Sequence, residues 1–121
     1  MQVPGYLEKQ DAIKAAGVDE VLVYCVNDGA VMQAWGKDQG IDGSMITFLG
    51  DPHSELTKAL GMELTHPGPV DVLGCGTRCK RFAMVVEKGV IQSVFVSESP
   101  DDPAGGADPS LSCVDHVLST L

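Results

Sequence analysis

The sequence has little positive charge. Eight Lys and Arg residues stand against 17 Asp and Glu, which gives a formal net charge of −9 at pH 7. Nucleic acids and anionic membrane surfaces are bound through basic faces. We therefore expect neither of them as a partner of this chain.

Long apolar runs are also missing. No stretch reaches the ~18 apolar residues that cross a bilayer. The first ten residues, MQVPGYLEKQ, lack the basic and then apolar pattern of a secretory signal peptide. We expect no membrane insertion and no secretion, and a reducing compartment instead: the cytoplasm or an organelle such as the mitochondrion or plastid.

Cysteine is sparse as well. Four cysteines are scattered along 121 residues, and no two of them form a CxxC pattern. This argues against a secreted disulfide scaffold. Cys75 and Cys79 are close in sequence, but a structural zinc site would need two further ligands. We expect neither a metal nor a bound cofactor.

The most informative stretch that is present runs from 78 to 87. Three cations, Arg78, Lys80 and Arg81, flank Cys79, and the apolar residues 82–86 that follow predict a buried strand. Positive charge beside a thiol lowers its pKa and favours the reactive thiolate. Cys79 is therefore a candidate reactive thiol, with an anion or a polar substrate held at the strand end. The alternative is an inert cysteine at a solvated strand end.

Hydrophobic periodicity predicts helices and strands in alternation. The expected helices cover 6–16, 28 to between 36 and 40, 51–60 and 111–121, and the expected strands cover 21–26, 45–49, 82–86 and 90–97. Such alternation indicates an α/β fold with a mostly parallel sheet. The final hairpin and helix match the second half of a thioredoxin-like fold. No repeat or linker divides the chain, so we expect one domain over residues 1–121.

Long motifs fill most of the chain. They are PGYLEK at 4–9, GVDEVLVYCVND at 17–28, VMQAWGK at 31–37, GDPHSELTKALGMEL at 50–64, and LG followed by TRCKRFAMVVEKGV within 73–90. In this order they resemble the type II, or peroxiredoxin-5-like, peroxiredoxins. The resemblance implies a thioredoxin-like fold and a cysteine-based reduction of hydrogen peroxide and alkyl hydroperoxides. It also implies thioredoxin or glutathione with glutaredoxin as reductant, and often a homodimer.

The resemblance assigns roles to individual residues. Arg81 matches the family arginine that binds the peroxide oxygen and stabilises the attacking thiolate. Cys113, in the stretch SLSC before the last helix, looks like the resolving cysteine of the animal-type members; the alternative is a packing residue at a helix start. Cys25 lies two residues after the position of the second cysteine in plant-type members, and its apolar surroundings indicate a core residue.

One departure from the family bears on activity. The peroxidatic cysteine of the family lies in a PGAFTPTCS-type segment just before PGY, and PGY begins here at Pro4. The resemblance thus places that cysteine before Met1, and none of the chain's four cysteines takes its position. We expect an N-terminally truncated family member that is inactive on its own.

The sequence leaves three functions open. The first is a peroxiredoxin whose attacking cysteine is supplied outside these residues. The second is a pseudo-enzyme that serves as a dimerisation or scaffold subunit. The third is a different thiol chemistry at Cys79.

The same departure affects the expected sheet. In a thioredoxin-like sheet a central strand lies between the strands at 21–26 and 82–86, and this sequence has no residues to form it. Unpaired buried backbone groups cost about 1–3 kcal/mol each. We therefore expect that the two strands pair directly, or that a second chain covers their edges in a homo-oligomer or a larger assembly.

Overall fold

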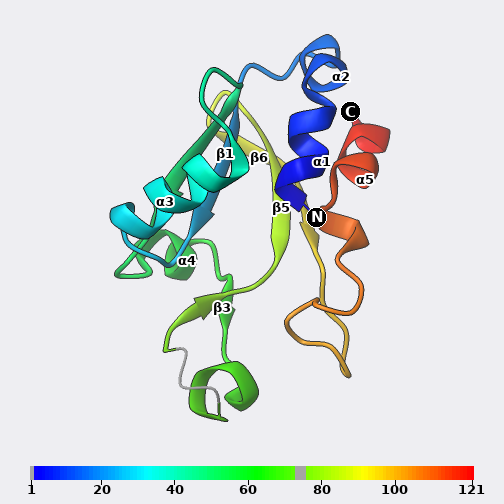
Figure 1. The fold of residues 1–121 in the computed structure, drawn as a ribbon. Helices are drawn as coiled ribbons and strands as arrows, with labels where there is room; N and C mark the ends of the chain where they lie inside the picture. Colours follow the sequence, from blue (N-terminus) through cyan, green and yellow to red (C-terminus); the bar gives the residue numbers. More distant parts are fainter. Residues whose placement is uncertain (1, 73–75) are drawn as a thin grey trace.

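The computed structural model describes residues 2–72 and 76–121. In chain order the elements are α1 (Gln2–Glu8), α2 (Gln10–Ala15), β1 (Val21–Cys25), α3 (Gly29–Gln39), β2 (Ile46–Gly50), α4 (Glu55–Ala59), β3 (Glu63–Leu64), a π-helical turn (Gly68–Val72), β4 (Arg78–Cys79), β5 (Phe82–Glu87), β6 (Val90–Val96), a 3-10 turn (Ser110–Ser112) and α5 (Val114–Thr120). The predicted α/β class is confirmed (Figure 1). No helix in the described ranges is long and apolar enough to cross a membrane.

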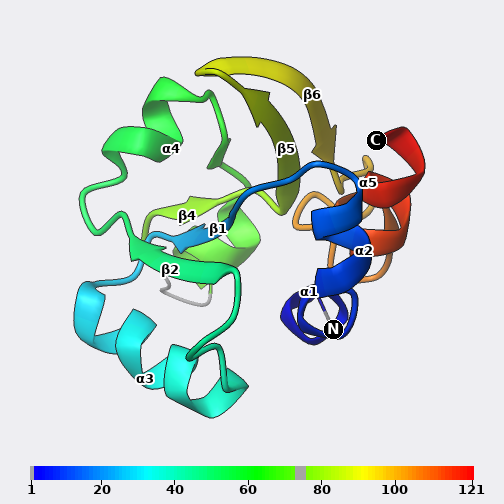
Figure 2. The same ribbon diagram turned by 90° about the horizontal axis from the view of Figure 1, so that it is seen from above.

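Helices lie on both sides of the strands. The helices α1, α2 and α5 gather on one side, whereas α3 lies beside β2 on the other (Figures 1 and 2). Burial follows this division. Val3, Ile13 and Val114 are buried around the first group, and Met32 and Ile46 are buried between α3 and β2.

The strands form three separate two-stranded sheets rather than one continuous sheet. β1 pairs in parallel with β2, from Val21 opposite Ile46 to Cys25 opposite Gly50. β5 and β6 form the predicted antiparallel hairpin. In the described residues β1 pairs only with β2 and β5 only with β6, so the first of the two expected alternatives, direct pairing of β1 with β5, is wrong. Coverage of the edges by a second chain stays a prediction.

The strand β1 is less buried than its sequence predicted. Its apolar sequence predicted a strand buried on both faces, but Leu22 is 59% exposed and the other β1 residues are only partly buried. The sequence pattern describes a strand inside a sheet, and β1 is an edge strand here. The prediction is wrong because a strand is buried on both faces only where other elements cover each face of its sheet.

Helix boundaries differ from the prediction near the N-terminus. The helix expected at 6–16 starts at Gln2 and is interrupted at Lys9, which separates α1 from α2. Pro4 is accommodated because it lies in the first turn, where the backbone N–H needs no helical partner. Gly17 follows α2 with φ of 93° and ends it as expected.

The helix expected from Asp51–Pro52 also starts later, at Glu55. The Asp51 carboxylate instead accepts hydrogen bonds from the amides of Leu56 at 3.3 Å and Thr57 at 2.9 Å. Asp51 therefore satisfies the free amides of the first turn of α4 from outside the helix.

A small sheet was not expected from the sequence. Leu64 and Arg78 lie opposite each other where β3 pairs with β4, and the Lys80 amide donates to the Met62 carbonyl at 2.8 Å. Two-residue strands are too short to leave a periodic signal. The pairing holds the cationic stretch before β5 in an extended conformation.

Candidate functional site

Arg81 lies directly before β5, and its side chain reaches the start of α1. Its guanidinium donates a hydrogen bond to the Gln2 Oε1 at 2.9 Å. The two residues are 79 positions apart in sequence. The cationic group that the resemblance assigned to peroxide binding is thus held beside the first turn of the chain.

A buried polar network continues from Gln2. The Gln2 amide nitrogen donates to the Ser112 hydroxyl, which lies 2.9 Å from the Ser97 hydroxyl. Both hydroxyls contact the Pro109 carbonyl, at 3.0 Å from Ser112 and 3.1 Å from Ser97. Ser97 and Ser112 are each 1% exposed. The network connects Arg81 through these residues to the end of β6.

Tyr6 and Cys113 lie against this network. The Tyr6 hydroxyl donates to the Ser112 carbonyl at 3.0 Å. Burial raises the pKa of Tyr6 to about 12, and the negative charge of a Cys113 thiolate adds to the effect. The Cys113 thiol contacts the Pro109 carbonyl at 3.4 Å, and the residue precedes α5 as its N-cap. The predicted position of Cys113 at a helix start is confirmed; its role as a resolving thiol stays a prediction.

A second group of side chains gathers where β1 ends and β4 lies. Cys25 and Cys79 are both partly buried there, as is Tyr24, whose ring meets Phe82 edge-on at 5.8 Å between centroids. The Tyr24 hydroxyl accepts a long, 3.4 Å hydrogen bond from the Thr57 hydroxyl. This group holds two of the chain's thiols close to Arg78.

The expected depression of the Cys79 pKa is wrong. Burial raises the pKa of Cys79, and this outweighs the lowering by backbone hydrogen bonds and by Arg78. Burial likewise raises the pKa of Cys25, with the charge of Cys79 acting in the same direction and Arg78 and Arg81 acting against it. The sequence shows which charges are near a thiol, but desolvation depends on the packing around it.

A large hollow separates β1 from β5. It measures about 1640 Å³. We call it the β1–β5 cleft. Its walls are β1 and β5, and its lining includes residues of α1, α2, α4 and α5. Cys25, Cys79 and Arg81 line it, whereas Cys113 is not among its lining residues. Two of the three sequence-predicted site residues, Cys79 and Arg81, therefore share one cavity.

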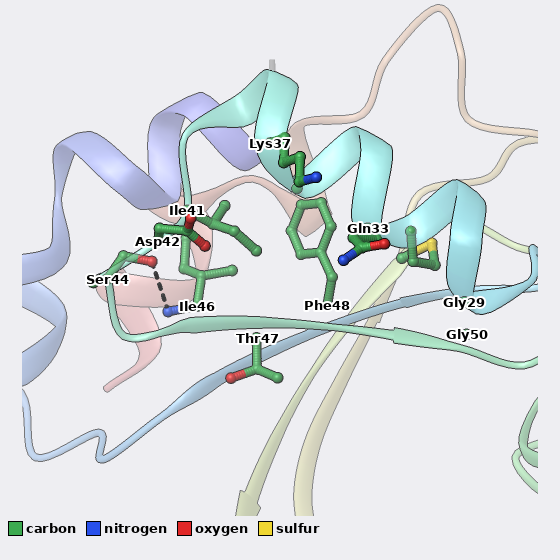
Figure 3. A pocket seen from close by; sticks show the side chains of 13 residues that line it. Gly29, Gln33, Lys37, Ile41, Asp42, Ser44, Ile46, Thr47, Phe48 and Gly50 are labelled. Carbon is green, nitrogen blue, oxygen red and sulfur yellow. Dashed lines mark hydrogen bonds between the residues drawn. The ribbon is translucent and has the colours of Figure 1, made fainter.

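A smaller hollow of about 510 Å³ lies between α3 and β2. Figure 3 shows that Lys37 and Asp42 are the ionisable side chains labelled around it. The Ser44 hydroxyl there accepts from the Ile46 amide at 3.1 Å (Figure 3). The hollow contains no thiol and no pair of acid and base groups in contact, so it is not the candidate site.

Metal ligands do not gather in the part of the chain that the structure describes. Across residues 2–72 and 76–121, no group of three or more His, Cys, Asp or Glu side chains lies close enough together to hold a metal ion. Cys75, considered as a partner of Cys79, lies outside the described residues.

Sequence reasoning missed Gln2 as the hydrogen-bond partner of Arg81, and Ser97 and Ser112 as members of the network that continues from Gln2. Each is a common polar residue with no motif around it. Their relation appears only when α1, β6 and the turn before α5 come together in the fold.

Comparison with known proteins identifies the family. The family model described as Redoxin matches residues 1–111. Peroxiredoxin Pen c 3 of Penicillium citrinum is 35% identical over 98% of this chain and 62% of its own length. Peroxiredoxin-2B of Arabidopsis thaliana is 33% identical over 98% of this chain and 66% of its own length.

Solved structures agree with these relatives. Reduced Prx3 from Vibrio vulnificus in complex with H₂O₂ superposes with a TM-score of 0.79 at 33% identity, and the match covers 98% of this chain and 65% of that one. Peroxiredoxin 5 from Alvinella pompejana gives 0.68 at 38% identity, over 84% of this chain and 61% of that one. The predicted thioredoxin-like fold is confirmed.

The chain spans less than two thirds of the length of these two curated relatives. Residues 1–111, which the family model matches, include the cationic stretch and the hairpin that follows it. The chain belongs to the redoxin family and is a peroxiredoxin of its type II, peroxiredoxin-5-like group.

Proposed function

We propose that this chain acts in the thiol-dependent reduction of hydrogen peroxide and alkyl hydroperoxides, with Arg81 as the group that holds the peroxide oxygens. The observation that carries the proposal is the reach of the Arg81 guanidinium to Gln2 at the start of α1. A thiolate beside this guanidinium would attack one peroxide oxygen. The O–O bond breaks, the thiolate becomes a sulfenic acid, and hydroxide leaves with the electron pair.

The guanidinium contributes to this step in two ways. Its positive charge stabilises the thiolate before attack. Its planar N–H donors also stabilise the negative charge that develops on the leaving oxygen. A second thiol would then condense with the sulfenic acid and release water, and Cys113 is the candidate for this resolving step. Thioredoxin, or glutathione with glutaredoxin, would reduce the resulting disulfide in the cytoplasm or an organelle.

We propose that residues 1–121 alone do not reduce peroxide at a rate typical of the family. Burial raises the pKa values of both Cys25 and Cys79, which keeps these thiols protonated at neutral pH. Cys113 contacts the Pro109 carbonyl rather than Arg81. The Arg81 guanidinium itself is engaged with Gln2. None of the described thiols therefore forms a hydrogen bond with the Arg81 guanidinium, the group that would activate it.

The variant Gln2→Cys tests the role of Arg81 by placing a thiol where its hydrogen-bond partner now lies. We expect the thiol at position 2 of this variant to form a sulfenic acid with hydrogen peroxide about tenfold faster than Cys25, Cys79 or Cys113 of the same chain, since one unit of thiol pKa changes the thiolate fraction about tenfold. Trapping with dimedone and peptide mapping would measure the rate at position 2. Gln2→Ser is the matched control without a thiol.

Adding Arg81→Met to Gln2→Cys should abolish the gain, because the cation is then absent. If Gln2→Cys reacts equally fast with and without Arg81, the proposed peroxide-binding role is wrong. Turnover by the unmodified chain that disappears in Cys79→Ser would instead assign the chemistry to Cys79.

A further inference from the structure

Two thiols come together where β1 and β4 end. Cys25 is the last residue of β1, and Cys79 is the last residue of β4. Both thiols are free and partly buried, and both line the β1–β5 cleft. Cys113 is not among the lining residues. The peroxide chemistry proposed for Arg81 uses neither Cys25 nor Cys79, so this pair has no role in it.

An aromatic contact joins the two segments that carry these thiols. The ring of Tyr24, which directly precedes Cys25, meets the ring of Phe82 edge-on with 5.8 Å between centroids. Phe82 begins β5, shortly after Cys79 in the chain. The Tyr24 hydroxyl also lies 3.4 Å from the hydroxyl of the fully buried Thr57. The end of β1 is therefore packed against the segment that contains Cys79.

The two sulfurs also act on common neighbours. Burial raises the pKa of Cys79, whereas its own backbone N–H and that of Val26, the residue after Cys25, donate to the sulfur and lower it. Burial raises the pKa of Cys25, and the negative charge of a Cys79 thiolate adds to this effect. A hydrogen bond requires close approach, so the Cys79 sulfur lies beside the end of β1.

Other strands hold the backbone at both thiols. The Cys25 carbonyl accepts a hydrogen bond from the Asp51 amide at 2.8 Å. Cys79 lies opposite Glu63 in the ladder of β3 and β4. Both cysteines are thus fixed by the fold before they react. Joining two groups that are already held close together costs less conformational entropy than joining two separate chains.

Burial also favours the oxidised form of such a pair. A dithiol is kept reduced where its thiolates are stabilised, and burial instead raises the pKa values of both Cys25 and Cys79. A disulfide carries no charge and so avoids the cost of burying a thiolate. Arg78 lowers both pKa values and thereby maintains the small fraction of thiolate that exchange requires.

We infer that Cys25 and Cys79 are a redox-active pair that forms an intramolecular disulfide between the ends of β1 and β4. The oxidant is a small-molecule disulfide of the glutathione class. The Cys79 thiolate attacks one of its sulfurs, so that a mixed disulfide forms and one small thiolate leaves. The Cys25 thiolate then attacks the Cys79 sulfur and the second small thiolate leaves. The two protein thiols lose two electrons, and the two small thiolates take up the two protons.

The disulfide joins two elements that share no backbone ladder in the part of the chain that the structure describes. There β1 pairs with β2, and β4 pairs with β3. The new bond would therefore fix the cationic stretch 78–81 relative to β1. The inference itself does not depend on whether Arg81 binds peroxide.

The test is equilibration of the full chain with oxidised and reduced glutathione, followed by alkylation of the remaining thiols and non-reducing peptide mapping. Trypsin cleaves after Arg78, so Cys75 and Cys79 fall on separate peptides and each possible bond is identified by mass. The expected product is the bond between Cys25 and Cys79. Its fraction should not change when the chain is diluted about tenfold, because the reaction is intramolecular.

Serine variants test the order of the two steps. Cys25→Ser should accumulate the mixed disulfide at Cys79 at least about tenfold more than the unmodified chain, since no second thiol displaces the small thiol. Cys113→Ser is the matched control and should form the bond between Cys25 and Cys79 as readily as the unmodified chain. Circular dichroism of both variants checks that each is folded.

Three results would overturn the inference. They are a bond between Cys75 and Cys79 as the main product, a disulfide-linked dimer whose fraction falls on dilution, and an unmodified chain that stays reduced or stops at the mixed disulfide in excess oxidised glutathione. The reaction of Gln2→Cys with peroxide needs neither Cys25 nor Cys79. The two proposals therefore fail separately.

Discussion

The Arg81 guanidinium and the Gln2 side-chain oxygen are joined by a hydrogen bond of 2.9 Å, although they lie 79 positions apart. This contact connects the cationic stretch before β5 to the first turn of the chain. It places Arg81 at the edge of the β1–β5 cleft, beside a buried network of serine hydroxyls. The charge of the arginines, the serine network, the loop beside it and the ionisation of Tyr6 can each be tested separately.

The first prediction separates the effects of the two arginines on the thiols. Arg78 lowers the pKa values of both Cys25 and Cys79, whereas Arg81 is among the causes only for Cys25. Arg78→Met should therefore slow alkylation of both thiols, by about two- to fivefold, and Arg81→Met should slow only Cys25. Timed iodoacetamide labelling with peptide mapping measures each rate, with Cys113 as internal reference.

The same labelling decides the order of the two thiols. The flanking cations predict that Cys79 is alkylated faster than Cys25, and the order remains a prediction because burial raises both pKa values. Equal rates, or a faster Cys25, would show that desolvation rather than neighbouring charge sets reactivity here.

A second prediction concerns the buried hydroxyl of Ser112. It contacts Gln2, Ser97 and Pro109 and is 1% exposed. Ser112→Ala should lower the free energy of unfolding by about 1–3 kcal/mol, because the Ser97 hydroxyl loses a partner in a buried site. Urea unfolding measures the change. Ser119→Ala, on the exposed face of α5, is the control and should change stability by less than about 0.5 kcal/mol.

The third prediction compares two adjacent glycines in the loop after β6. A Cβ at Gly105 would lie 2.0 Å from the Ser97 carbonyl oxygen, and the residue has φ of 67°. Gly106 has nothing within 4 Å of such a Cβ. Gly105→Ala should destabilise the fold by about 2 kcal/mol or more. Gly106→Ala should be neutral within about 0.5 kcal/mol, and similar losses in both variants would contradict the tight packing of this loop on Ser97.

The fourth prediction concerns alkaline pH. The pKa of Tyr6 is raised to about 12, whereas an unfolded tyrosine ionises near 10. The unfolded chain therefore releases this proton first, so the contribution of Tyr6 is fully present below about pH 10 and is lost as pH rises to about 12. Urea midpoints between about pH 8 and pH 11 should fall for the unmodified chain and fall less for Tyr6→Phe. An identical pH dependence in both proteins would exclude Tyr6 as the group responsible.

Much of the local structure followed from the sequence. The β-branched run at 82–86 with Lys88 and Gly89 predicted the β5–β6 hairpin, which the structure forms with Lys88 at φ of 51° and Gly89 at 79°. The Asp28 N-cap and the left-handed Gly40 define α3 close to its expected bounds. Such signals are local, because each depends on the conformations of a few adjacent residues.

Of the candidate site, the sequence indicated Arg81, Cys79 and Cys113 but not their surroundings. The charges beside Cys79 were visible, and the burial that raises its pKa was not. Gln2 and Ser112 had no local signal at all, since their interaction spans 110 positions. Groups of this kind become neighbours only through packing, and a pattern of a few residues carries no information about it.

By itself the sequence determined the α/β class, the family, the order of the helices and strands and the acidic charge, because composition, periodicity and motif order are properties of the chain alone. The tertiary structure decided which edges of β1 and β5 remain without a strand partner among the described residues, how deeply Cys25 and Cys79 are buried, and that Arg81 meets Gln2. These features depend on the distance and the desolvation between segments far apart in sequence, and only the folded arrangement fixes those quantities.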